Sequence, residues 1–250
     1  MAGFAGKVVL VTGAGRGAGR AVALAFAAQG ALLAVNDITP INLDQTVAQV
    51  QKMGGQVKDY IFDIAKRLPA SVLVDEVLGD WGRLDILVNH ANVKPRATIL
   101  EMDEWDWQRT LDVNLSGVFY LMQSAGRAMR EQGGGVIVNI GWTTGRAHGL
   151  SDRFAYLVSN SGLAGLSREA AHEFAAYNIR VNMVCDGPPA GQEQSENAST
   201  RLPQAAELVL FLSSPAAAHI TGQVIPVGSG WLVGLPGMDA NGSQQDLKLE

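Results

Sequence analysis

The most constraining feature of the sequence is a glycine-rich turn between an apolar strand and a helix. The turn follows the apolar run Lys7–Val11 and precedes the alanine-rich stretch Arg20–Gln29. Glycines let a backbone turn tightly and approach a pyrophosphate, whose charge is met by amide groups at the helix N-terminus. The arrangement therefore predicts a dinucleotide-binding unit. Its candidate cofactor-binding residues are Thr12, Gly13, Gly15, Arg16, Gly17 and Gly19.

A carboxylate follows the second predicted strand. The run Ala31–Asn36 ends in Asp37, about 20 residues beyond the turn, where an acid accepts hydrogen bonds from adenosine ribose hydroxyls. Because a carboxylate repels a 2′-phosphate, Asp37 favours NAD over NADP, although Arg16 weakly favours the reverse. The alternative is an ordinary strand-to-helix turn with a helix-capping aspartate.

Apolar strand-like runs alternate with helical stretches along the whole chain. Such runs indicate a parallel sheet covered by helices on both faces. We expect a single Rossmann-type, doubly wound α/β domain over residues 1–237, with a seven-stranded parallel sheet and a polar tail at 238–250. The polar segment Pro188–Thr200 is expected to be a loop. The predicted strands are Lys7–Val11, Ala31–Val35, Val57–Phe62, Leu84–Val88, Val136–Ile140, Ile179–Val184 and Val224–Val227.

Composition narrows the function classes. The 250 residues carry a net charge of −5 without a basic cluster, which argues against a nucleic-acid partner. The lone Cys185 forms no internal disulfide, and the N-terminus lacks a signal-peptide pattern, so we expect a cytoplasmic protein. No apolar run reaches the roughly 18 residues of a membrane span, and the histidines and the cysteine show no metal-ligand spacing.

Several motifs together resemble the short-chain dehydrogenase/reductase family. Beyond the glycine turn and Asp37, they are Asp63-Ile64, Asn89-His90-Ala91-Asn92, Asn114 and Tyr156. The resemblance extends from Phe4 to Trp231 and is strongest to 3-oxoacyl-thioester reductases and hydroxyacyl dehydrogenases. It implies an NAD cofactor contacted also by Asp63, Ile64, Asn89 and Ala91.

The resemblance also implies a catalytic group of asparagine, serine, tyrosine and lysine. Asn114 and Tyr156 match the asparagine and the tyrosine. Trp142 stands at the serine position, and a slip of one residue would place the hydroxyl of Thr143 there. Asn160 stands where the lysine would hold the ribose and acidify the tyrosine.

The loss of the lysine matters because a free tyrosine has a pKa near 10. Lowering it to about 7 takes roughly 4 kcal/mol, which a nearby cation supplies more readily than a neutral amide. Arg153, Arg146 and His148 are candidate replacement cations, and the alternative is that they are solvated surface charges. Tyr156 in turn is either the remaining acid/base or a helix residue that fills the old pocket.

Other departures lie in the same half of the site. Asn92 replaces a family glycine near the cofactor ribose, Asp186 replaces a proline, and the segment Pro188–Leu202, which would carry a substrate lid, is short. His90 is either a proton carrier or a hydrogen-bonded structural histidine. The adenosine half of the expected site is thus preserved, and the catalytic half is altered.

Three hypotheses follow. The first is a catalytically impaired homologue that serves as a structural or regulatory subunit, in a homo- or hetero-oligomer with a homologous chain. Its contacts are expected on the long helices Glu104–Arg130 and Arg153–Ala176. The second is a working NAD-dependent oxidoreductase that uses Tyr156, Thr143 and a replacement cation. The third is an NAD-sensing module that needs only the preserved half.

Overall fold

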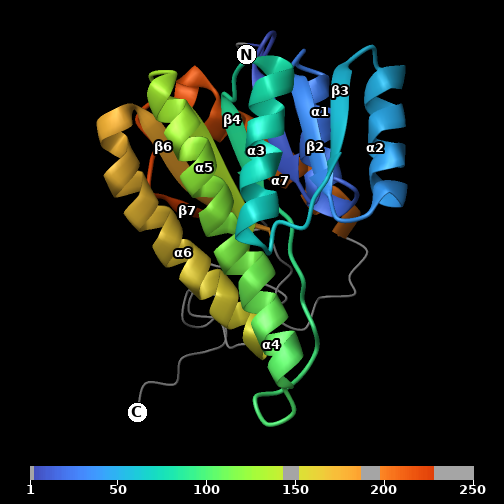
Figure 1. The fold of residues 1–250 in the computed structure, drawn as a ribbon, viewed down its shortest axis with the longest axis vertical. Coiled ribbons are helices and arrows are strands. Elements are labelled where there is room, and N and C mark those ends of the chain that lie inside the picture. Colours follow the sequence, from blue (N-terminus) through green and yellow to red (C-terminus); the bar gives the residue numbers. More distant parts are fainter. Residues whose placement is uncertain (1–2, 143–151, 187–197, 228–250) are drawn as a thin grey trace, which may run out of the picture.

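The fold is a parallel sheet with helices on both faces, and it is described from a computed structural model (Figure 1). The structure describes residues 3–142, 152–186 and 198–227, and within α7 it describes side chains from residue 203 onward. The strands are β1 Val8–Thr12, β2 Leu32–Asp37, β3 Gln56–Ile61, β4 Ile86–Asn89, β5 Gly135–Gly141, β6 Ile179–Asp186 and β7 Val224–Val227. The helices are α1 Gly17–Ala27, α2 Pro40–Lys52, α3 Arg67–Trp81, α4 Glu104–Leu111, α5 Gly117–Glu131, α6 Phe154–Phe174 and α7 Ala198–Ser213. Short π or 3₁₀ turns are η1 Asp112–Ser116, η2 Ala175–Tyr177 and η3 Pro215–Ala217.

The strand order is β3-β2-β1-β4-β5-β6-β7, and every pairing is parallel. The order reverses at β1, which pairs with β2 on one side and β4 on the other. In such sheets the crevice at the carboxyl ends of the strands, where the order reverses, is the usual ligand site. The predicted doubly wound α/β fold with seven parallel strands is confirmed.

The two faces of the sheet are covered by separate apolar clusters. On β1, the side chains alternate, so that Val9 and Val11 join one cluster, whereas Val8 and Leu10 join the other. The first cluster packs under α1, α2 and α7, and the second under α3, α5 and α6. Figure 1 shows α3, α5 and α6 in front of the sheet and α1 behind it.

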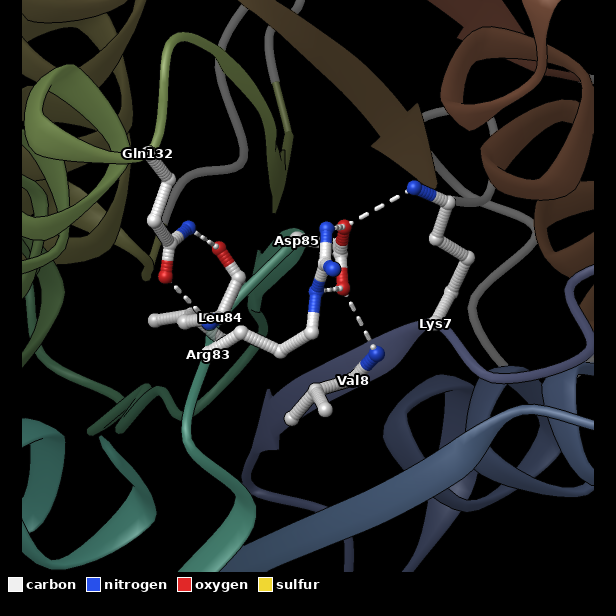
Figure 2. A network of polar contacts seen from close by, with 6 residues as sticks. All are labelled: Lys7, Val8, Arg83, Leu84, Asp85 and Gln132. Carbon is white, nitrogen blue, oxygen red and sulfur yellow. Dashed lines mark hydrogen bonds and ion pairs between the residues drawn. The ribbon is translucent and has the colours of Figure 1, made fainter. Parts of the chain in front are cut away.

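The start of the sheet, opposite the crevice, is held by a polar network around Asp85 (Figure 2). The carboxylate accepts hydrogen bonds from the Val8 N–H at 3.0 Å, from Lys7 Nζ at 3.0 Å and from Arg83 Nη2 at 2.6 Å. The side-chain amide of Gln132 also pairs with both backbone groups of Leu84, at 3.0 and 2.9 Å. The network therefore joins β1, the entry to β4 and the end of α5.

Most predicted strands differ from the observed ones by one or two residues at their ends, and three other boundaries differ more. The first helix begins at Gly17, three residues before the predicted start at Arg20. The long helix expected over Glu104–Arg130 is interrupted by the π-helical turn η1. The expectation of a loop over Pro188–Thr200 is wrong at its end, since α7 begins at Ala198. Polar residues begin this helix, but its later apolar residues, such as Val209 and Leu212, pack in the core and stabilise it.

Residues 187–197, which hold most of the expected short lid, lie outside the described residues, as does the predicted tail. The boundary between domain and tail therefore stays a prediction. None of the described helices combines the length and the apolar character needed to cross a lipid bilayer.

Candidate functional site

A cavity of about 960 Å³ opens at the carboxyl ends of the strands. It extends from the glycine turn and Asp37 at one end to Gly141, Tyr156 and Asp186 at the other. The sheet topology explains this position, because the loops after β1 and β4 diverge to opposite faces and leave a crevice between them.

The glycines of the turn are required by close backbone contacts. Gly13 and Gly17 have φ angles of 63° and 58°, which favour glycine. A Cβ at Gly19 would overlap the carbonyl oxygen of Gly13 and lie 2.6 Å from Nδ1 of His90. A Cβ at Gly15 would lie 2.6 Å from Oδ2 of Asp37. The cradle therefore excludes side chains at these positions, as a pyrophosphate-binding turn requires.

Two side chains behind the turn bind its backbone carbonyl groups on the side away from the cavity. The hydroxyl of Thr46 donates to the Ala14 carbonyl at 2.9 Å. The guanidinium of Arg20 donates to the Gly15 carbonyl and, through Nε, to Thr46 Oγ1 at 3.1 Å. Because the carbonyl oxygens are occupied away from the cavity, their partial negative charges do not face a bound anion.

Thr12 joins the end of β1 to the loop after β4. Its hydroxyl oxygen accepts hydrogen bonds from the backbone N–H groups of His90 at 3.1 Å and Ala91 at 3.3 Å. Nδ1 of His90 lies 3.2 Å from the Gly13 carbonyl, which can only accept, so this nitrogen carries the proton. Burial lowers the pKa of His90 to about 4. The geometry favours the hydrogen-bonded structural histidine over the proton carrier.

Asp37 faces the cavity at the end of β2. Its Oδ2 accepts the Gly15 N–H at 3.1 Å, and its Oδ1 accepts the Ile38 N–H at 2.8 Å. These bonds hold the carboxylate beside the turn, where it can accept ribose hydroxyls. Further along the cavity, Asp63 pairs with Arg109 at 3.1 Å.

Asn114 is buried within the π-helical turn η1 and organises the loop after β4. Its Oδ1 accepts the Val93 N–H and its Nδ2 donates to the Val93 carbonyl, both at 2.8 Å. Nδ2 also lies 3.1 Å from Oγ of Ser159 on α6. Since Val93 lines the cavity, Asn114 shapes the cavity wall through the backbone rather than by direct contact.

Asn160 lies on α6 with 2% of its surface exposed, and both ends of its side-chain amide are engaged. Oδ1 accepts the backbone N–H of Trp142 at 2.6 Å, and Nδ2 donates to the Tyr156 carbonyl at 2.8 Å. The indole of Trp142 stacks on the ring of Tyr156, with centroids 6.3 Å apart and planes at 23°. Its Nε1 has no hydrogen-bond partner among the described residues. The positions of the expected serine and lysine thus belong to a packed structural contact.

Tyr156 lines the cavity, but its surroundings favour the neutral phenol. Burial first, and then the carboxylate of Asp186, raise the pKa of Tyr156 to about 12, against a smaller lowering by Arg153. A phenol with this pKa is a poor proton acceptor near pH 7, because about one molecule in 100,000 is ionised. It remains able to donate a hydrogen bond.

The predicted site residues fall into two layers. Gly13, Arg16, Gly17, Asp37, Asp63, Ile64, Ala91 and Tyr156 line the cavity. The second layer lies behind the cavity wall and supports it, and it consists of Thr12, Gly15, Gly19, Asn89 and Asn114. Asn89, for example, donates to Asn139 at 2.8 Å and links β4 to β5. Thr143, Arg146 and His148 lie outside the described residues.

Sequence reasoning missed several polar residues that line the cavity, among them Thr39, Asn42, Lys94 and Arg109. Each belongs to a segment without a recognisable motif.

The comparisons with known proteins agree with this geometry. A family model described as short chain dehydrogenase matches residues 7–201. The chain belongs to the short-chain dehydrogenase family. Among relatives of this family, an uncharacterized oxidoreductase of Thermotoga maritima is 37% identical over 248 residues, covering 91% of this chain and 98% of the relative.

Two further relatives of this short-chain dehydrogenase carry more specific names. The 3-oxoacyl-[acyl-carrier-protein] reductase FabG of Thermotoga maritima is 34% identical, covering 91% of this chain and 98% of its own length. The solved structure of NAD⁺-bound xylitol dehydrogenase superimposes with a TM-score of 0.81 at 27% identity, covering 90% of this chain and 99% of that one. The expected resemblance to the family is confirmed.

Proposed function

We propose that this short-chain dehydrogenase binds NAD(H) but is impaired in proton transfer, and that it serves as a structural or regulatory subunit. Its partner would be an active homologous NAD-dependent dehydrogenase acting on a hydroxyacyl or oxoacyl thioester. The observation that carries the proposal is the engagement of Asn160 with Trp142 and Tyr156, at the position where the family resemblance implies a lysine.

The preserved end of the cavity fits a dinucleotide. The cradle excludes a Cβ at Gly19, the N-terminus of α1 faces the turn, and the Asp37 carboxylate lies beside it. Asp37 also disfavours a 2′-phosphate, so NAD is expected rather than NADP. A solved relative of the family is bound to NAD⁺, which supports the same cofactor here. When bound, the cofactor would supply the hydride chemistry, and the chain would supply the binding groups.

The other end of the cavity supports the impairment. Tyr156 retains its proton because burial and Asp186 raise its pKa to about 12. Asn160 is neutral and has both amide ends occupied, so it supplies no positive charge. Trp142 has an indole in place of a small hydroxyl, and this ring stacks on Tyr156. Together these features support weak acid/base chemistry at this site.

The proposed subunit role draws on α5 and α6. A groove along α5, the end of α6 and η2 is lined by both charged and apolar residues, and two of its aromatic residues, Phe119 and Tyr177, are each 43% exposed. Exposed aromatic surface of this kind is common where chains assemble. The similarity to a 3-oxoacyl reductase supports a homologous partner with a thioester substrate.

A second candidate function is an active oxidoreductase with a rearranged site, and Arg153 favours it. Its side chain is 12% exposed, and its charge lowers the pKa of Tyr156. In this function Tyr156 remains the proton donor and acceptor and Arg153 stands in for the lysine. The named relatives, among them a 3-oxoacyl reductase, are consistent with such an enzyme.

The deciding experiment is calorimetric titration with NAD⁺ and NADH, run beside a hydride-transfer assay on a short 3-oxoacyl thioester. Binding with no turnover supports the proposal, and failure of both cofactors to bind overturns it. Turnover that Tyr156→Phe abolishes establishes the second candidate instead. A combined Trp142→Ser and Asn160→Lys variant, with Ser161→Ala on the same helix as control, tests whether the two replacements alone limit the chemistry.

A further inference from the structure

Asp186 is a charged residue at the catalytic end of the cavity, and the proposed function uses it only through its effect on Tyr156. It ends β6, where it pairs with Val227 of β7, and the preceding Cys185 pairs with Gly141 of β5. It lines the cavity together with Gly141 and Tyr156. The family resemblance implies a proline at this position, so the carboxylate is a feature of this chain.

The extended shape of a dinucleotide indicates which part of it would lie near Asp186. A dinucleotide consists of two nucleosides joined through a pyrophosphate. If the adenosine lies at Asp37 and the pyrophosphate at the glycine turn, the second nucleoside lies at the opposite end of the cavity. That end is formed by Gly141, Tyr156 and Asp186. The nicotinamide would therefore lie near the carboxylate.

Among the described residues at that end, two charged side chains act on Tyr156, and the larger effect is that of Asp186. Asp186 acts on the phenol of Tyr156 more strongly than Arg153 does, since its raising of the pKa exceeds the lowering by the arginine. At the other end, beside the glycine turn, Lys94 and Arg16 lower the pKa of His90 and Asp37 raises it, so charges of both signs act there. A positive charge on the second nucleoside would lie at the end that Asp186 lines.

We propose that Asp186 makes this site bind NAD⁺ in preference to NADH. The inference rests on the proposed cofactor binding. The oxidised nicotinamide ring carries a positive charge and the reduced ring is neutral, while the rest of the two molecules is the same. A fixed carboxylate near the ring therefore stabilises only the oxidised form, because Coulomb attraction at a partly buried side chain is stronger than in bulk water. A chain that binds this way without turning the cofactor over would respond to the redox state of the NAD pool.

The test is calorimetric titration of the full chain with NAD⁺, NADH and ADP-ribose, which lacks the nicotinamide. We expect NAD⁺ to bind about tenfold more tightly than NADH, and Asp186→Asn to remove most of that difference. ADP-ribose affinity should be the same in both proteins, because the carboxylate does not act at the adenosine end. Asp186→Glu retains the charge and should retain the preference, which separates an electrostatic role from a packing role.

Asp37→Asn is the matched control, since it changes a carboxylate at the adenosine end. It should weaken NAD⁺ and NADH alike and leave their ratio unchanged. If none of the three ligands binds the wild-type chain, the proposed function fails. If they bind but the wild type shows no preference for NAD⁺, or Asp186→Asn keeps the preference, this inference alone is overturned.

Discussion

The side-chain oxygen of Asn160 accepts the backbone N–H of Trp142 at 2.6 Å, which joins α6 to the end of β5. The residue at the expected lysine position is therefore part of the framework. Asn160→Ala would leave the buried Trp142 N–H without a partner, at a cost of about 1–3 kcal/mol in the free energy of unfolding.

Denaturant unfolding of the purified chain measures this cost. Ser161→Ala on the same helix is the control, because its hydroxyl is exposed and donates to the Leu157 carbonyl one turn back. We expect the control to change stability by less than about 0.5 kcal/mol. Equal stabilities of the two variants would refute a framework role for Asn160.

Tyr156 should stay protonated through the neutral range, because burial and Asp186 raise its pKa to about 12. At pH 8 about one phenol in ten thousand would be ionised, and this fraction rises about tenfold with each pH unit. The ultraviolet difference spectrum between wild type and Tyr156→Phe should show tyrosinate only in strongly alkaline solution. A transition near pH 7 would mean that a cation acidifies the phenol, in favour of the active enzyme.

Asp85 should stabilise the sheet in a pH-dependent way. Burial alone would raise its pKa, but hydrogen bonds from Arg83, the Val8 N–H and Lys7 lower it overall. A carboxyl whose folded pKa lies below its unfolded value of about 3.9 stabilises the native state above that pH. The stabilisation is lost as the pH falls through the folded pKa.

We therefore expect Asp85→Asn to lose about 1–3 kcal/mol at pH 7 in urea unfolding. The difference from wild type should shrink as the pH falls below about 4, where the carboxyl is first protonated in the unfolded state, and it should vanish once the folded carboxyl is protonated too. Lys7→Met, which removes one half-exposed partner, should cost less. A difference in unfolding free energy between wild type and Asp85→Asn that does not change with pH would contradict this account.

Two glycine-to-alanine changes should have opposite effects. Gly19→Ala places a Cβ against the Gly13 carbonyl and 2.6 Å from Nδ1 of His90, so the turn must move. Gly79→Ala lies within α3 with nothing within 4 Å of the new Cβ, and it should stabilise the helix by about 0.5–1 kcal/mol.

Thermal unfolding and NAD⁺ titration of both variants check these expectations. Gly19→Ala should lower the melting temperature and weaken cofactor binding, while Gly79→Ala should raise the melting temperature and leave binding unchanged. Normal NAD⁺ affinity in Gly19→Ala would argue against the turn as the pyrophosphate site.

Much of the fold could be predicted because its signals are local. The apolar runs of β1 and β2 and the glycines between β1 and α1 each need only neighbouring residues to be recognised. Boundaries were less predictable. The start of α7 at Ala198 depends on the packing of its later apolar residues against the sheet. The polar residues near the start of the helix give no sign of this packing.

The candidate site was predicted in part. The glycine turn and Asp37 follow a fixed spacing, and the structure brings them together at one end of the cavity. Arg109 was missed, because its pairing with Asp63 joins α4 to the segment after β3, 46 residues away in the chain. Such a contact exists only once the elements are packed.

The sequence by itself determined the fold class, the glycine cradle and the presence of Trp142 and Asn160 where the family resemblance implies serine and lysine, because each depends on residue type and short spacing. Only the tertiary structure decided what the replacements do. In the folded chain Asn160 binds the backbone amide of Trp142, 18 residues away, and Trp142 stacks on Tyr156. Asp186 lies at the same end of the cavity as Tyr156. These contacts join α6, β5 and β6, and the packing of those elements sets which polar groups meet.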